Sequence, residues 1–184
     1  MWGGYQGPIV EDCAHTFFSD DTVIGSYGDM VIYSLPKAFP MQIGALITSK
    51  ECNLAEIQSV NEDVAEYVYS HFAPNIDLIE HVKEQRIHNY LWLVEHLSPL
   101  GISPFFDNAD ISVNDVIPSV YLFKCNHEVD LPGLKEYMQN NGIECSVFYG
   151  KNAFYIPCNE TLNTDELEYM ETLIKWFFTA HAAK

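Results

Sequence analysis

Basic residues are scarce in this sequence. The 184 residues include nine Lys and Arg against 26 Asp and Glu, which gives a formal net charge of −17, and Arg86 is the only arginine. A nucleic-acid-binding surface needs clustered Lys and Arg that neutralise phosphates, and so does a surface that docks on anionic lipid. The composition therefore argues against a nucleic-acid partner and against a membrane partner.

The sequence also lacks long hydrophobic runs and paired cysteines. No stretch approaches the roughly eighteen apolar residues that a membrane-spanning helix needs, and the N-terminal segment has no signal-peptide pattern. The five cysteines are an odd number and include no C-x-x-C pair. A disulfide framework or a thiolate zinc site is therefore not expected. We expect a soluble protein of a reducing compartment, the cytoplasm.

Apolar residues are plentiful by contrast. Hydrophobic residues make up 48% and aromatic residues 14% of the chain, which is enough to bury a sizeable core and excludes wholesale disorder. Strand-length apolar runs occupy the first third, at 8–14, 30–34 and 44–48. Apolar residues stand consecutively in parts of these runs, which predicts a sheet covered on both faces.

Helical spacing follows. The pattern predicts helices over 54–72, ended by Pro74, and over about 76–97. The last third predicts alternating elements: strands 117–125, 143–148 and 153–157, and helices 131–141 and 164–178. Asp130 is the expected N-cap of the 131–141 helix and Gly142 its C′ residue. Asn163 and Glu166 have the spacing of a capping box.

Two side chains in the first third suggest chemistry. Asp12 lies in an apolar run at the predicted C-terminal end of a strand, where a buried carboxylate must be paired or hydrogen-bonded. Lys37 follows a second strand among apolar neighbours, and desolvation of a lysine makes its amine nucleophilic towards carbonyls. A lysine and a carboxylate at strand ends are the groups that pyridoxal 5'-phosphate (PLP) requires.

The residues alone leave simpler interpretations open. A buried Asp12–Lys37 pair can be purely structural, and His15 can be a hydrogen-bonded core histidine. His81, Glu84 and His88 share a helical face that could hold a metal, although a solvated face is the better interpretation. Gly25, Gly28 and Gly44 indicate tight turns or close backbone approach, since no dinucleotide-binding G-x-G-x-x-G is present.

A resemblance favours the PLP interpretation. The order E-D-x-A-H (11–15), G-S-x-G-D (25–29), Ser34, Lys37 and then Gly44 before a strand resembles the DegT/DnrJ/StrS sugar aminotransferases. These are fold-type I PLP enzymes. The segment RIHNYLWLVEHL (86–97) is similar to the family's helix after the hinge, and 117–121 resembles the strand that opens its small domain. The similarity corresponds to the C-terminal half of a family chain.

The resemblance implies a role for each matching residue. Asp12 would pair with the pyridinium nitrogen, His15 would contact the ring hydroxyl, and Ser34 would contact the phosphate. Lys37 would be the catalytic lysine that forms the Schiff base and shuttles the proton. Tyr149 in VFYG matches a substrate-side tyrosine. The expected substrates are a small-molecule amino donor such as glutamate and a keto-sugar attached to a nucleotide.

The expected fold class is α/β: a remnant of the PLP-transferase large-domain sheet (1–75), followed by a linking helix and a small α+β C-terminal domain (76–184). The expected function is that of a PLP-dependent aminotransferase-like protein, truncated, in polysaccharide or deoxysugar biosynthesis. Two alternatives stay open. One is a catalytically dead remnant that serves as a binding or assembly module, and the other is a C-terminal half that needs a separate N-terminal partner. Exposed sheet edges would favour a homodimer or such a partner.

Overall fold

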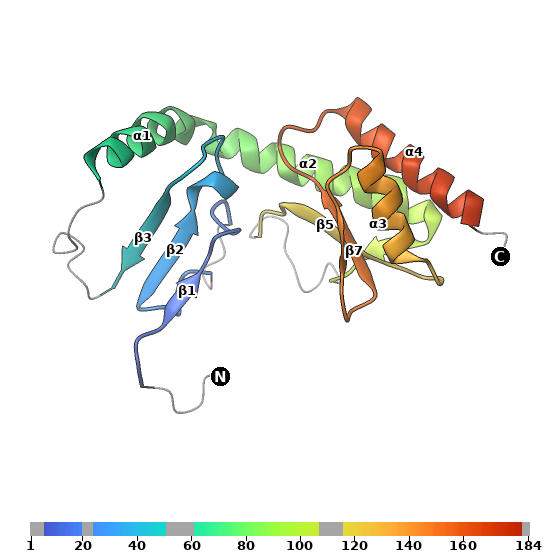
Figure 1. Cartoon of the computed structure of the whole chain (residues 1–184), viewed down its shortest axis with the longest axis horizontal. Helices are drawn as coiled ribbons and strands as arrows, with labels where there is room; N and C mark the ends of the chain where they lie inside the picture. The colour runs from blue at the N-terminus through green and yellow to red at the C-terminus, as the bar shows by residue number, and fades with distance from the viewer. Residues whose placement is uncertain (1–5, 20–23, 51–60, 107–115, 182–184) are drawn as a thin grey trace. The chain divides into compact units, whose positions relative to one another are not determined.

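The chain contains two compact units, Met1–Glu80 and His81–Lys184, in the computed structural model (Figure 1). The structure describes residues 6–19, 24–50, 61–106 and 116–181. The architecture is mixed α/β, as the sequence predicts, with one sheet in each unit. None of the helices in the described ranges is long and apolar enough to cross a membrane.

Unit 1 contains a three-stranded sheet of order β1-β2-β3. The strands are β1 (Val10–Asp12), β2 (Met30–Ser34) and β3 (Ala45–Ser49). β1 runs parallel to β2, and β3 runs antiparallel to it. All three strands fall within or beside the predicted runs, although β1 is shorter than its run because the chain turns away after Asp12.

Aromatic rings fill the interior of unit 1. The ring centroid of Phe17 lies 5.0 Å from that of Phe39, 5.9 Å from that of Tyr33 and 6.2 Å from that of Phe72. These edge-on arrangements are the preferred geometry for aromatic pairs. Phe72 comes from α1 (Glu62–Phe72), so the cluster attaches this helix to the sheet.

α1 has a defined start and end. Asn61 caps it by accepting the N–H of Asp63 at 2.9 Å, and Pro74 follows in a 3₁₀ turn, η3 (Ala73–Leu78). The predicted end before Pro74 is confirmed. The predicted residues 54–60 of this helix lie outside the described residues.

The prediction that the first sheet is covered on both faces is wrong for the described residues. Val10, Leu46 and Ile47 are 51%, 40% and 44% exposed. Consecutive apolar residues do occur in these strands, but the helix and loops described in unit 1 do not cover all of them. Val31 is 4% exposed and packs into the interior.

Unit 2 contains a four-stranded antiparallel sheet of order β4-β5-β7-β6. Helix α2 begins just before the boundary between the units, and α3 contacts both α4 and β6. The elements are α2 (Ile79–Leu97), η4 (Ser98–Leu100), β4 (Ile102–Pro104), β5 (Val120–Cys125), α3 (Leu131–Asn140), β6 (Ser146–Phe148), β7 (Ala153–Pro157) and α4 (Thr164–His181).

Local sequence signals define the helix ends of unit 2. The carboxylate of Asp130 accepts the N–H of Gly133 at 3.0 Å, as an N-cap does. Gly142 has φ +83°, which suits a C′ glycine. Asn163 and Glu166 form the predicted capping box: the Glu166 N–H donates to Asn163 Oδ1, and the Asn163 N–H donates to Glu166 Oε2. These three predictions are confirmed.

The interior of unit 2 combines large apolar side chains with one polar cluster. Tyr121, Phe123 and Phe154 are fully buried. Asn89 on α2 is also fully buried, and its Nδ2 donates to the carbonyls of Asn159 at 2.7 Å and Leu162 at 3.3 Å. Because a buried amide needs such partners, α2 is attached to the 159–162 loop by polar as well as apolar contacts.

Candidate functional site

The register of β1 and β2 determines where the candidate side chains lie. Asp12 pairs with Ile32 in the parallel ladder. Paired residues project to the same face of a sheet, and so do residues two apart along a strand. Asp12 and Ser34 therefore project from one face at the carboxyl ends of neighbouring parallel strands, and Lys37 follows three residues later.

Asp12 lies at the last position of β1. Its Oδ1 accepts the N–H of Ala14 at 3.0 Å, and the side chain is exposed. The prediction that this carboxylate is buried is therefore wrong. The strand ends at Asp12, and the exposed side chains of Val10 and Ile47 lie on the same face of the sheet. The second carboxylate oxygen of Asp12 has no hydrogen bond to a described residue and is available to a ligand.

Lys37 ends a 3₁₀ turn, η1 (Leu35–Lys37), that follows β2 directly. The turn is fixed by Leu35, which is 2% exposed and donates its N–H to the Gly44 carbonyl at 3.1 Å. Phe39 is buried on the same side, whereas Lys37 itself is exposed. The predicted desolvation of this lysine is therefore wrong: its apolar neighbours turn into the core and direct Lys37 outward.

His15 and Ser34 complete the predicted set. His15 lies in the turn after β1 and is exposed, so it is not the core histidine that one interpretation allowed. Ser34, at the end of β2, is half-buried and pairs with Ala45 of β3. The unit thus brings Asp12, Ser34 and Lys37 to one end of the parallel strand pair, with His15 in the loop that follows the first strand.

Glu11, which the sequence pattern does not mark as a site residue, lies at the centre of a polar cluster in unit 1. Its carboxylate accepts the N–H groups of Gly25 at 2.7 Å, Tyr27 at 3.0 Å and Gly28 at 2.9 Å. These hydrogen bonds, that of Gly28 foremost, lower the pKa of Glu11. In the sequence, the alternation of side chains along the strand is what separates Glu11 from Asp12, because it places the two side chains on opposite faces of the sheet.

The glycines of this loop behave as predicted. Gly25 has φ +77°, a left-handed conformation that other residues rarely adopt. At Gly28 an added Cβ would lie 2.5 Å from the carbonyl oxygen of Met30 and 2.8 Å from the Cβ of Glu11. The loop can therefore approach β1 closely only with glycine at this position.

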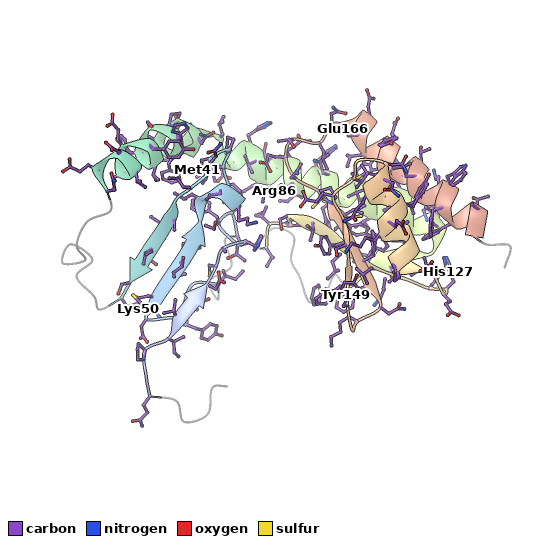
Figure 2. The ribbon with its side chains drawn as sticks, in the orientation of Figure 1. Met41, Lys50, Arg86, His127, Tyr149 and Glu166 are labelled. Carbon is purple, nitrogen blue, oxygen red and sulfur yellow. The ribbon has the colours of Figure 1, made fainter. Side chains whose placement is uncertain are left out.

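Tyr149 belongs to unit 2, in the turn between β6 and β7 (Figure 2). The side chain is 69% exposed, and the ammonium of Lys135 lies 5.9 Å from the centre of its ring. A lysine at this distance interacts favourably with an aromatic face. Tyr149 is thus accessible to a ligand at the end of the hairpin.

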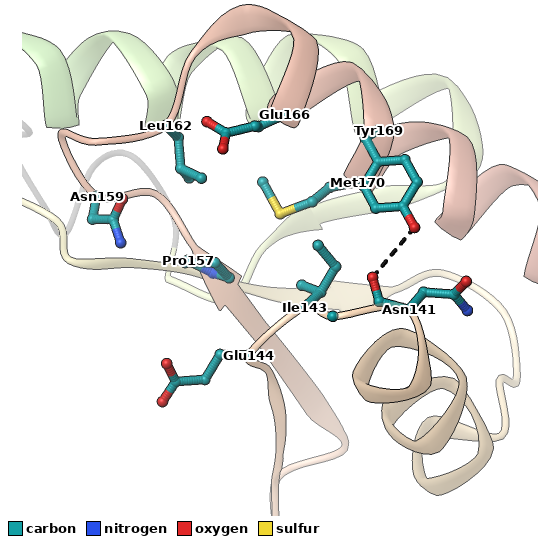
Figure 3. A pocket seen from close by; sticks show the side chains of 10 residues that line it. Asn141, Ile143, Glu144, Pro157, Asn159, Leu162, Glu166, Tyr169 and Met170 are labelled. Atoms are coloured by element: carbon teal, nitrogen blue, oxygen red, sulfur yellow. Dashed lines mark hydrogen bonds between the residues drawn. The ribbon is translucent and has the colours of Figure 1, made fainter.

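A hollow of about 370 Å³ lies in unit 2 between the end of α3 and the start of α4 (Figure 3). Ile143, Leu162 and Met170 contribute apolar side chains to it, and Glu166 lies at its rim. The Tyr169 hydroxyl donates to the Asn141 carbonyl at 3.2 Å across one side. The residues that line this hollow include none of the candidate site residues predicted from the sequence.

Two other groups of reactive side chains do not form sites. Within the described ranges no three His, Cys, Asp or Glu residues are placed to hold a metal ion, and His81, Glu84 and His88 are exposed on α2. The thiols of Cys145 and Cys158 are free and buried. Burial raises their pKa to about 11 and about 12, which keeps them protonated and unreactive.

Solved structures share the fold over most of this chain. A DegT/DnrJ/EryC1/StrS aminotransferase from Brucella abortus matches this chain with a TM-score of 0.66 at 16% sequence identity. The match covers 92% of this chain and 57% of the Brucella chain. The sugar aminotransferase CalS13 from Micromonospora echinospora has a TM-score of 0.64 at 15% identity, covering 94% and 59%. The fold is that of PLP-dependent transferases.

The likeness is one of structure. Neither a protein-family model nor a curated protein matches the sequence. A structure described as the PLP form of sugar aminotransferase Spr1654 from Streptococcus pneumoniae matches with a TM-score of 0.65 at 12% sequence identity. The match covers 58% of that chain. The chain thus spans between half and three fifths of these structures. The expected resemblance to sugar aminotransferases is confirmed at the level of the fold.

Proposed function

We propose that the carboxyl ends of β1 and β2 form the lysine side of a PLP site, and that the chain functions as a PLP-dependent aminotransferase. The observation that supports this proposal is the parallel register of Asp12 with Ile32. It gives Asp12 and Ser34 a common face, and Lys37 follows at the same end of the sheet. A carboxylate and an amine at adjoining strand ends suit the two reactive ends of PLP.

The exposure of these side chains fits a bound group. The second carboxylate oxygen of Asp12 is available, and Lys37 forms no ion pair with the described residues of unit 1. An accessible amine can reach the aldehyde of a bound cofactor. The donor set thus suits the pyridine nitrogen and the aldehyde, while Ser34 would provide a single hydroxyl for the phosphate.

Each residue would have a separate role. When bound, PLP supplies an aldehyde and an electron-accepting ring. The Asp12 carboxylate would hold a proton on the ring nitrogen, and His15 would contact the ring hydroxyl. Lys37 would hold the cofactor at its aldehyde, and its amine, once displaced by the substrate amine, would carry the proton to and from the substrate α-carbon. Tyr149 would contact the substrate.

The proposed substrates are an amino acid donor such as glutamate and a keto-sugar nucleotide acceptor. The overall exchange would convert the donor amino acid into its 2-oxo acid and the keto group of the sugar into an amino group. This proposal is supported by the fold, since three of the similar structures described above are aminotransferases by their descriptions. We place the protein in polysaccharide or deoxysugar synthesis in the cytoplasm.

A second function is favoured by one observation. Val10 and Ile47, on the same face as Asp12, are 51% and 44% exposed. An apolar face of this kind is typical of a surface that another polypeptide covers. The unit would then complete a PLP site together with a segment equivalent to the part of the similar structures that this chain does not span, or serve as an assembly module without catalysis.

Titration of the purified chain with PLP tests the proposal. A visible absorption band that is fixed by borohydride, with the label on Lys37 by mass spectrometry, is the expected result. Lys37→Arg should lose the band, because the guanidinium keeps the charge but does not react with aldehydes. Lys151→Arg, at an exposed lysine of unit 2, is the matched control and should retain it.

The outcomes separate the two functions. A band in the parent chain alone supports the aminotransferase. A band only after the addition of a polypeptide that supplies the rest of the fold supports a composite site. A featureless spectrum in both cases, or a label distributed equally over several lysines, would refute a PLP site at Lys37.

A further inference from the structure

The connection between β1 and β2 is attached to β1 by two carboxylates. Glu11, in the middle of β1, accepts the N–H groups of Gly25, Tyr27 and Gly28. Asp29, immediately before β2, accepts the N–H of Ile9 at 2.7 Å through its side chain. Glu11 therefore joins the body of β1 to the segment before β2, and Asp29 joins the residues that immediately precede the two strands.

The backbone reinforces the Asp29 attachment. The Asp29 N–H donates to the Ile9 carbonyl at 2.8 Å, so the two residues exchange a pair of hydrogen bonds. The carbonyl of Asp29 accepts the N–H of Lys50 at 3.1 Å beyond the end of β3. Asp29 is thus connected to the segments that flank all three strands of the sheet.

β1 is a short strand, so its register depends on few contacts. It is three residues long and pairs only with β2 among the described strands. A parallel pair of this length is weak by itself, and a slip by one residue would move every side chain of β1 to the opposite face. Asp12 would then no longer share a face with Ser34.

We propose that Glu11 is a positioning residue that fixes β1 in register on β2, and so keeps Asp12 on the face and at the strand end where Lys37 follows. The proposal rests on the PLP site proposed above. Charge-assisted hydrogen bonds are stronger than neutral ones, and three of them converge on this single side chain. Asp29, which follows Gly28 directly, supports the same register through its hydrogen bonds with Ile9 just before β1.

Glycine geometry agrees with this role. A Cβ at Gly28 would lie 2.8 Å from the Cβ of Glu11 and 3.0 Å from its nitrogen, so the loop lies directly against β1 at the residue that holds it. At Gly25 an added Cβ would lie 2.6 Å from the hydroxyl of Tyr33 in β2. The loop is therefore confined between both strands while Glu11 binds its N–H groups.

Amide hydrogen exchange of the parent chain and of Glu11→Gln tests the proposal without any cofactor. The Cys13 N–H, which donates to the Ile32 carbonyl at 2.9 Å, reports the register next to Asp12. Loss of charge-assisted hydrogen bonds should speed exchange at Gly28 and at Cys13 by roughly tenfold each. Glu66→Gln, at an exposed glutamate of the same unit, should leave both rates unchanged.

PLP titration adds the functional readout. Glu11→Gln should weaken PLP binding by roughly tenfold, while Glu66→Gln keeps the parent affinity. If Glu11→Gln does not fold, Asp29→Asn provides the second variant, because Asp29 is exposed and its side chain accepts the Ile9 N–H just before β1. It should speed exchange at Cys13 to a smaller extent.

Two results would overturn the proposal. In one, Gly28 exchanges faster in Glu11→Gln while Cys13 is unchanged, so the glutamate holds the loop but not the register. In the other, both rates rise and PLP affinity stays at the parent value. A parent chain that takes no PLP would instead refute the proposed cofactor site, and the exchange rates at Cys13 would still decide whether Glu11 sets the register.

Discussion

The buried hydroxyl of Tyr121 provides a sharp test of the unit 2 core. Tyr121 lies in β5 and is fully buried, and its hydroxyl has no hydrogen-bond partner among the described residues. Burial raises the pKa of Tyr121 far above its usual value, so the phenol stays neutral. Its ring packs edge-on against Tyr90 at 5.3 Å between centroids. The ring is well packed, so the unfavourable feature of this side chain is the burial of its hydroxyl oxygen without a hydrogen bond.

Tyr121→Phe should therefore stabilise the protein. A buried hydroxyl without a partner costs about 1–3 kcal/mol, and removal of one oxygen leaves a gap too small to offset that cost fully. We expect the free energy of unfolding to rise by about 1 kcal/mol, which corresponds to a Tm increase of about 2–4 °C for a chain of this length. Urea denaturation followed by circular dichroism measures the first, and a thermal scan the second.

The control is Tyr169→Phe, because the hydroxyl of Tyr169 is exposed and donates to the Asn141 carbonyl. It should lower the free energy of unfolding by roughly 0.5 kcal/mol. If Tyr121→Phe instead destabilised the protein by more than the control does, the hydroxyl would have a partner, such as a buried water, and the reasoning would be refuted.

Three further changes have defined expectations. Asn89→Ala removes the donor to two loop carbonyls and should lower the free energy of unfolding by about 2–4 kcal/mol in urea titrations. Asn163→Ala removes the α4 cap and should cost about 1 kcal/mol in the same assay. Because the pKa of Glu11 is lowered from about 4.5, its stabilisation should be present above that value and lost as the pH falls through the folded-state pKa. The stability difference between parent and Glu11→Gln should therefore shrink in acid; a difference that is constant from pH 7 to 3 would contradict this.

Much of the fold could be predicted from local sequence. The run MVIYS matches β2, Asp130 caps α3, and Asn163 with Glu166 caps α4, because each signal lies within a few residues of its effect. β4 was missed, since Ile102–Pro104 is three residues long and is defined by its pairing with β5 rather than by its own pattern. Short strands depend on distant partners, which periodicity does not report.

The candidate site could be predicted only in part. The predicted strand ends gave the positions of Asp12 and Lys37 correctly. Their exposure depends on whether other elements cover the sheet, and neighbouring residues in the sequence do not reveal this covering. Apolar neighbours of Lys37 indicated burial, whereas Leu35 and Phe39 turn inward and direct the lysine outward. The role of Glu11 has no signal in the sequence, because its partners are backbone N–H groups, which no residue type identifies.

The polar contacts between α2 and the 159–162 loop have a practical consequence for any shortened form of the protein. Arg86 is 5% exposed and its Nε donates to Glu160 at 2.7 Å, one helical turn before Asn89 reaches the same loop. A fragment that began at the second sheet, near Ile102, would remove both donors and leave the carbonyls around Asn159 without their amide partner. A separately expressed C-terminal piece should therefore start no later than His81, with the helix treated as part of the domain it leads into.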